Sequence, residues 1–209
     1  MSDESRAVSS HATVRKAETH ERAAVVSSVI EAFANDPAWA FILDGEYERL
    51  APHFAGALFD IRLAAGTVWV TDDLAATAMW DRPKSVAAAA STELAARTWT
   101  NYRALAGPDA AARLTRYNGA VASKAPEEPY WYLGVLATRP SAQRQGLASA
   151  VLAPILREAD RDGLACCLET STVGNRRFYE HRGFTQATDI TLPDGPPTWW
   201  LRRSPPPRS

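Results

Sequence analysis

The sequence predicts an α/β domain in which about six or seven strands form a sheet flanked by helices. Short apolar segments typical of strands alternate with longer segments in which apolar residues recur at helical spacing. The 209 residues suit one sizeable domain, and the content of 46% hydrophobic and 22% charged residues is ordinary for a globular protein. We therefore expect a single domain over residues 13–203, with loose tails at 1–12 and 204–209.

The first elements are predicted to be a strand, two helices and a β-hairpin. Thr19 suits the N-cap of the first helix, and the sequence Asn35-Asp36-Pro37 is predicted to end it. Gly66 is predicted to close the second helix, and Asp72-Asp73 forms the turn of the hairpin. The predicted bounds are a strand over 13–16, helices over about 19–34 and 46–64, and hairpin strands over 67–71 and 75–80.

The rest of the chain continues the alternation of helices and strands. Gly107-Pro108 separates an Ala-rich helix over about 85–106 from the helix that follows. Pro154 lies inside a predicted helix, where it removes a backbone donor, and we expect a kink there. The remaining predicted elements are strands over 130–138, 165–170, 184–191 and 198–202, and helices over about 146–161 and 175–181.

Composition excludes several classes of function. The net charge of -1, without a block of basic residues, argues against a nucleic-acid partner. No apolar run approaches the roughly 18 residues of a membrane span, and the polar N-terminus lacks a secretory signal, so we expect a cytoplasmic protein. The only cysteines, Cys166 and Cys167, are adjacent, and the four histidines do not cluster, so we expect no metal.

The stretch from Gln143 to Ala148 is the most informative segment, because it lies between an apolar strand and a helix. At such a turn the free N–H groups and the positive end of the helix dipole converge, which favours a phosphate. Gly146 and the small Ala148 would let a pyrophosphate approach the backbone, and Arg144 could add a charged contact. The alternative is a plain strand–helix turn.

A second constellation lies about 25 residues further on. Asn175 and Tyr179 are four residues apart and therefore share one face of the predicted short helix. An amide and a phenol on that face could contact an extended ligand side by side. The alternative is that Asn175 caps the helix and Tyr179 is a half-buried aromatic residue.

These two motifs, in this order and spacing, resemble those of the GCN5-related N-acetyltransferases (GNAT). The first signature is matched by Gln143, Gly146 and Ala148, and the second by Asn175, Phe178-Tyr179 and Gly183-Phe184. The likeness covers about residues 14–203 and is closer still to the puromycin N-acetyltransferases of that family. Its most specific pieces are Val68-Trp69-Val70, Glu128-Pro129, Trp131, Leu168-Glu169-Thr170-Ser171, Phe178-Tyr179-Glu180 and Thr198-Trp199.

The resemblance implies a fold and a co-substrate. The sheet would be mixed and mostly antiparallel, with strands 130–138 and 165–170 as a splayed parallel pair. Acetyl-coenzyme A (acetyl-CoA) would bind with its pantetheine arm between those strands and its pyrophosphate on the backbone of residues 144–149. The implied cofactor-binding residues are Leu136, Ala137, Thr138, Arg144, Gln145, Gly146, Leu147, Ala148, Ser149, Asn175 and Tyr179.

Two residues are candidates for the proton transfers. By resemblance, Tyr179 would protonate the leaving CoA thiolate, because a thiolate leaves more easily when a positioned acid protonates it. A base is also needed, since an ammonium ion has no lone pair with which to attack. Glu169 is the carboxylate on the adjoining strand, and burial would raise its pKa toward a useful range. It would act directly or through a water; the alternative is that it only binds the substrate cation.

The sequence says less about the acceptor. Aromatic residues suit a flat or apolar ligand, and we take Asp36, Trp39 and Trp131 as candidate substrate-binding residues. The puromycin enzymes have Tyr where this chain has Asp36, and an aspartate favours a more polar or more basic amine.

Three functional interpretations follow. The first is acetylation of a primary amine on a small molecule, such as an antibiotic or natural-product amine. The alternatives are a protein or peptide acceptor or another acyl group, and a non-enzymatic CoA-binding module. The sequence leaves monomer and homodimer open.

Overall fold

The computed structural model describes residues 12–83 and 89–207. Its centre is a seven-stranded sheet in the order β1-β2-β3-β4-β5-β7-β6, and only the β4–β5 pair within it is parallel. This confirms the predicted fold class. The strands are β1 Val14–Lys16, β2 Val68–Thr71, β3 Ala76–Asp81, β4 Tyr130–Thr138, β5 Ala165–Thr170, β6 Thr185–Ile190 and β7 Thr198–Arg203.

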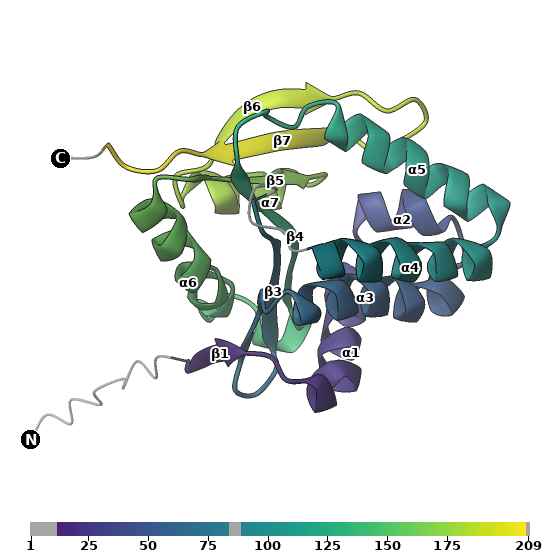
Figure 1. Cartoon of the computed structure of the whole chain (residues 1–209), viewed down its shortest axis with the longest axis horizontal. Coiled ribbons are helices and arrows are strands. Elements are labelled where there is room, and N and C mark those ends of the chain that lie inside the picture. Colours follow the sequence, from purple (N-terminus) through teal and green to yellow (C-terminus); the bar gives the residue numbers. More distant parts are fainter. Residues whose placement is uncertain (1–11, 84–88, 208–209) are drawn as a thin grey trace, which may run out of the picture.

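Helices cover both faces of the sheet. In Figure 1, α6 lies on one side of β3 and β4, whereas α3 and α4 lie on the other side. Short 3-10 turns precede α1 and α6 at Thr19–Glu21 and Pro140–Ala142. The helices are α1 Arg22–Phe33, α2 Pro37–Leu43, α3 Tyr47–Ala64, α4 Ala89–Ala106, α5 Pro108–Ala122, α6 Leu147–Asp162 and α7 Val173–Glu180.

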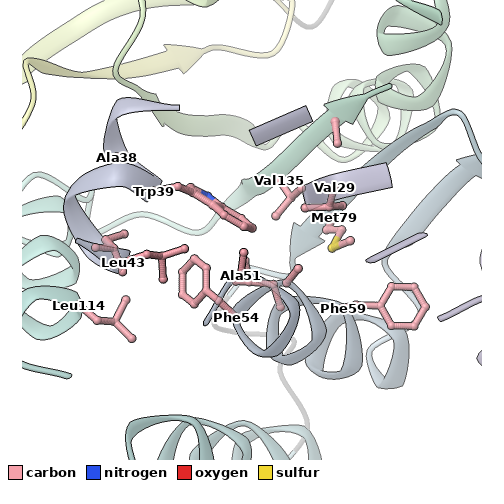
Figure 2. Packing of buried hydrophobic residues seen from close by; sticks show 14 of the residues in the cluster. Val29, Ala38, Trp39, Leu43, Ala51, Phe54, Phe59, Met79, Leu114 and Val135 are labelled. Atoms are coloured by element: carbon pink, nitrogen blue, oxygen red, sulfur yellow. The ribbon is translucent and has the colours of Figure 1, made fainter. Parts of the chain in front are cut away.

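Buried aromatic and aliphatic side chains join the helical layer to the sheet. Figure 2 shows Trp39 of α2, Phe54 of α3 and Val135 of β4 in this core. The ring centroids of Trp39 and Phe54 are 5.0 Å apart, and those of Phe33 and Trp39 are 4.6 Å apart. A second core packs α6 against the opposite face, around residues such as Leu152. The end of α1 and the start of α2 are therefore held firmly against β4.

The segment predicted to end the first helix begins another one. Asp36 is the N-cap of α2: its Oδ1 accepts hydrogen bonds from the backbone N–H groups of Ala38 (2.9 Å) and Trp39 (3.0 Å). Pro37 occupies the first turn, where its missing donor costs nothing. Helix α1 does end before this segment, at Phe33, as predicted. The prediction of Thr19 as the N-cap of the first helix is wrong, because Thr19 begins a 3-10 turn and α1 starts at Arg22.

Helix α6 is continuous through Pro154, with Val151, Leu152 and Ile155 buried on its inner face. Burial of that face compensates for the backbone hydrogen bond that the proline removes. The predicted start of the Ala-rich helix, at about residue 85, lies outside the described residues, as does the tail 1–12 apart from residue 12.

Strands β4 and β5 separate after a short paired region. Tyr130–Tyr132 pair with Ala165–Cys167, but β4 continues to Thr138 and β5 to Thr170. Against β3, the register shifts so that Leu133 lies opposite Trp80 and Val135 opposite Met79, which leaves Gly134 as a β-bulge. The bulge bends β4, and the sheet opens between the two strands.

Within the described part of the chain, no helix combines the length and apolar character needed to cross a membrane. Nor do His, Cys, Asp and Glu side chains there form a group of three or more suited to a metal ion.

Candidate active site

Two cavities meet at the opening between β4 and β5. The first, of about 280 Å³, lies under α1 to α5 and includes Glu169 in its wall. The second, of about 450 Å³, lies beside the turn that precedes α6. A ligand in one cavity can therefore reach a ligand in the other at the residues that line both: Phe33, Asp36, Leu136, Asn175 and Tyr179.

The turn before α6 has the backbone of an anion-binding loop. Arg144 and Gly146 have left-handed φ angles of 63° and 82°, and Gly146 is the N-cap of α6. A Cβ added to Gly146 would meet no atom within 4 Å, so this side of the glycine faces open space. Gln143 Nε2 donates to the Thr138 carbonyl at 3.3 Å, which ties the turn to the end of β4. The N–H groups of the first helical turn, which have no partner within the helix, border the second cavity.

Arg182 adds a second cation to this cavity, which sequence reasoning missed. Its Nε donates to Ser149 Oγ at 3.0 Å, and its Nη1 donates to the Phe178 carbonyl at 2.7 Å. Its guanidinium lies 3.5 Å from the centroid of the Phe178 ring. These contacts orient the cation beside the turn, where it can attract an anion. No spacing rule in the sequence links residue 182 to residue 149.

The predicted cofactor-binding residues gather around the second cavity with two exceptions. Ala137 is buried on the face of β4 that belongs to the core with Trp39 and Phe54, because neighbouring strand residues point to opposite faces of the sheet. Gln145 does not line the cavity. The residues that do line it are Leu136, Thr138, Arg144, Gly146, Leu147, Ala148, Ser149, Asn175 and Tyr179.

Asn175 and Tyr179 both face the junction of the cavities. The N-cap of α7 is Thr172, whose Oγ1 accepts from the Asn175 N–H at 3.2 Å, so the side chain of Asn175 is not the cap. The ring of Tyr179 packs at 5.6 Å against Phe184. Burial raises the pKa of Tyr179, and the charges of Glu169 and Asp36 raise it further. The phenol is therefore protonated at neutral pH.

Glu169 lies in the wall of the first cavity and is bound by a tyrosine. Tyr132 Oη donates to Glu169 Oε2 at 2.5 Å, while the Tyr132 ring stacks on Trp200 at 6.0 Å. Burial raises the pKa of Glu169 to about 7, and the hydrogen bond from Tyr132 opposes part of that rise. The carboxyl group can therefore take and release a proton near neutral pH. Sequence reasoning missed the role of Tyr132, because nothing in the sequence shows that its side chain faces Glu169.

The three residues predicted to bind the acceptor substrate have different environments. Asp36 caps α2 through Oδ1 and also lines both cavities, and Trp39 lines the first. Trp131 lines neither of them, because it is buried on the opposite face of the sheet, with the Arg82 guanidinium 5.5 Å from its ring. The structure thus removes Trp131 from the site.

An ion pair in the first cavity was not foreseen from the sequence. Arg62 is buried, and its Nη2 donates to Asp81 Oδ2 at 2.8 Å while its Nη1 donates to the Leu58 carbonyl at 3.3 Å. A Cβ on Gly134 would lie 2.2 Å from Arg62 Nη2, so the bulge in β4 leaves room for this guanidinium only with glycine. Arg62 lies on a largely apolar helix, where sequence reasoning would expect an exposed arginine.

The comparisons with known proteins identify the family of this chain. Residues 74–184, about half of the chain, match the Acetyltransferase (GNAT) family, and the chain belongs to that family. A relative described as an uncharacterized N-acetyltransferase of Schizosaccharomyces pombe is 21% identical over 188 residues, covering 85% of this chain and 76% of the relative. The chain is therefore an acetyl-transferring enzyme, and enzymes of this family use acetyl-CoA as co-substrate.

Solved structures with the same fold cover nearly the whole chain. One, described as a histone acetyltransferase and related acetyltransferase from Corynebacterium glutamicum, has a TM-score of 0.65 at 23% identity and covers 95% of this chain and 99% of that one. A polyamine N-acetyltransferase of Drosophila melanogaster has a TM-score of 0.67 at 14% identity, covering 92% of this chain and 99% of that one. At these identities the likeness concerns the fold.

Replacing Gly146 with valine tests the turn as the pyrophosphate site. A valine side chain would project into the open space beside the turn and keep an anion from the backbone, so we expect CoA to bind at least tenfold more weakly in calorimetry. Gly45→Val is the matched control, since Gly45 also has a positive φ and open space around its Cβ but lines neither cavity. Equal CoA affinity in Gly146→Val and the wild type would place the pyrophosphate elsewhere.

Proposed function

We propose that this enzyme transfers the acetyl group of acetyl-CoA to a primary amine of a small molecule. The observation that carries the proposal is the junction of the two cavities, with a titratable carboxyl group on one side and a phosphate-ready turn on the other. The first cavity holds about 280 Å³ and is covered by helices, which suits an enclosed small molecule better than a segment of a folded protein. Its carboxyl groups outnumber its cations: Arg62 pairs with Asp81, which leaves Asp36 and Glu169 to favour a cationic amine.

In this proposal the second cavity holds the CoA portion. The N–H groups of residues 144–149 bind the pyrophosphate, and Arg144 and Arg182 balance its charge. Backbone groups at Leu136, Ala137 and Thr138 pair with the pantetheine amides, as a neighbouring strand would. They suit this role because the pairing of β4 with β5 ends at Tyr132.

The proposed chemistry assigns one proton to each of two residues. The co-substrate supplies an acetyl group as a thioester. Glu169 takes a proton from the bound ammonium, directly or through a water, so that the amine nitrogen can form the new N–C bond. The backbone at Leu136 polarises the carbonyl oxygen, and Tyr179 donates its proton to the sulfur as the C–S bond breaks. The nitrogen of the adduct loses its second proton as the amide forms, and a proton returned to Tyr179 restores the phenol. The products are an N-acetylated amide, CoA with a free thiol, and the one proton that Glu169 passes to solvent.

Structurally similar enzymes have both kinds of acceptor. One is described as a histone acetyltransferase and another as a polyamine N-acetyltransferase, so the fold alone does not select between them. The helical cover of the first cavity favours the small amine. Among small amines, we propose a natural-product or antibiotic amine like that of the puromycin enzymes, with Asp36 favouring a more basic acceptor than theirs.

Thiol release from acetyl-CoA tests the acceptor class. With purified enzyme, we expect release to depend on added acceptor and to be fastest with primary amines or aminonucleosides rather than with peptides. Mass spectrometry should show a gain of one acetyl group on the amine. Faster turnover with peptides than with every small amine would overturn the proposed acceptor, and the absence of acceptor-dependent release would favour a CoA-binding role.

A further inference from the structure

A third cavity of about 510 Å³ adjoins the acceptor cavity. It shares Asp81, Asn118 and Tyr132 with the acceptor cavity and is otherwise lined by different residues. We call it the distal chamber. Its other lining residues come from the residue after β3, the end of α5, the connection to β4, and strands β4 and β7: Arg82, Val121, Ala122, Ala125, Pro126, Glu127, Glu128, Pro129, Tyr130 and Trp200.

The walls of the distal chamber are mainly aromatic and aliphatic. Trp200 is buried and contacts Tyr130 edge to face, with ring centroids 6.2 Å apart and an interplanar angle of 84°. Its ring is stacked with that of Tyr132 at 6.0 Å and 15°. Val121 and Ala125 add aliphatic surface. Such walls suit a planar, apolar group, which gains both burial and ring contacts.

Tyr132 connects the distal chamber to the catalytic carboxyl group. Its hydroxyl is held by Glu169, and its ring is held by Trp200, so its position is determined at both ends. Because Asp81, Asn118 and Tyr132 line both cavities, a molecule whose amine lies at Glu169 can reach the chamber along these three residues.

We infer that the acceptor is an elongated amine whose primary amino group lies at Glu169 and whose far end is an aromatic group in the distal chamber. This inference rests on the proposed function. The chamber would bind a second cation at the far end less strongly than an aromatic group. Asp81 already pairs with Arg62, and Glu127 and Glu128 are exposed, where ion pairs contribute little. The aromatic wall, in contrast, is partly buried.

The test compares amines that share a primary amino group but differ at the far end. The probes are n-butylamine, 4-phenylbutylamine and spermidine, with acetyl-CoA saturating and thiol release as the readout. For the wild type, kcat/KM is expected to be at least tenfold higher for 4-phenylbutylamine than for n-butylamine. In Ala122→Trp or Ala125→Phe, which would fill the chamber, this preference should fall to about twofold or less, because only 4-phenylbutylamine is long enough to enter the chamber. Ala112→Trp, an exposed alanine of α5 outside both cavities, should keep the wild-type preference.

The outcomes separate this inference from the proposed function. If no amine releases thiol, the proposed function fails. If 4-phenylbutylamine and n-butylamine react equally well in the wild type, or if both chamber-filling variants keep the wild-type preference, the aromatic far end is wrong. A preference for spermidine that these variants abolish would instead assign the chamber to a second cation and overturn the inference.

Discussion

Tyr179→Phe is expected to lower kcat by roughly 10²- to 10⁴-fold, the usual contribution of a positioned acid or base. Phenylalanine keeps the ring that packs against Phe178 and Phe184 and removes only the hydroxyl. The phenol is protonated at neutral pH because burial raises its pKa, so the wild type has a proton ready for the leaving thiolate. Steady-state kinetics with a reactive amine gives kcat, and calorimetry should show CoA affinity within a few-fold of the wild type.

Tyr47→Phe is the control for the loss of a tyrosine hydroxyl. Tyr47 Oη donates to the Ile30 carbonyl at 2.8 Å, and Tyr47 lines neither of the two cavities proposed for the reaction, so removal of its hydroxyl should leave kcat unchanged. If Tyr179→Phe retains wild-type kcat, water rather than Tyr179 protonates the thiolate. If it instead loses CoA affinity with unchanged kcat, Tyr179 is a binding residue.

Glu169→Gln is expected to lower kcat/KM, and the loss should be larger at neutral pH than at high pH. At neutral pH we expect a loss of roughly 10²- to 10⁴-fold. As a base, Glu169 must be deprotonated, and its pKa of about 7 means that kcat/KM of the wild type should rise with pH through about 7. Glutamine cannot take the proton, so the variant depends on the fraction of amine that is already free. Its activity should therefore approach that of the wild type only at high pH.

Tyr132→Phe provides the matching shift in the pH profile. The Tyr132 hydroxyl donates to Glu169 and lowers the pKa of the Glu169 carboxyl group, so removal of this hydroxyl should move the rise in kcat/KM to higher pH.

A Glu169→Gln profile with the shape and height of the wild-type profile would show that Glu169 is not the base. It would then only orient the substrate, and the proton would leave by another route.

Most of the fold could be predicted because its signals are local. Strands β4 and β5 have the predicted bounds, since each is a long apolar run between turn residues. Helix α2 was missed because Asn35-Asp36-Pro37 was interpreted only as a helix end. The same Asp-Pro pair is also a start signal, in which the carboxylate caps two N–H groups and the proline takes the first turn. Only tertiary packing, here Trp39 against Phe54, decides between these interpretations.

The site was predictable where it depends on a turn and less so where it depends on the β-bulge. The residues around Gly146 carry their own signal, because a strand, a small residue and a helix follow one another in the sequence. The prediction for Trp131 was wrong because side chains alternate between the two faces of β4, and the sequence does not show which face lines the cavity. Trp131 lies on the other face. The buried position of Arg62 could not be predicted from local sequence patterns. The space for its guanidinium exists only because Gly134, far along the chain, has no side chain there.

The opening between β4 and β5 divides the proposed catalytic machinery between two sets of elements. The acceptor cavity is built mainly from α1 to α5, whereas the second cavity is built mainly from the turn, α6 and α7. A substitution at Trp39, Phe54 or Leu114 thus reshapes the acceptor wall without touching the turn around Gly146. Under the proposed assignment of the two cavities, evolution or an engineer can retarget the enzyme to another amine by changing the helical layer, while the acyl donor and its binding turn stay the same.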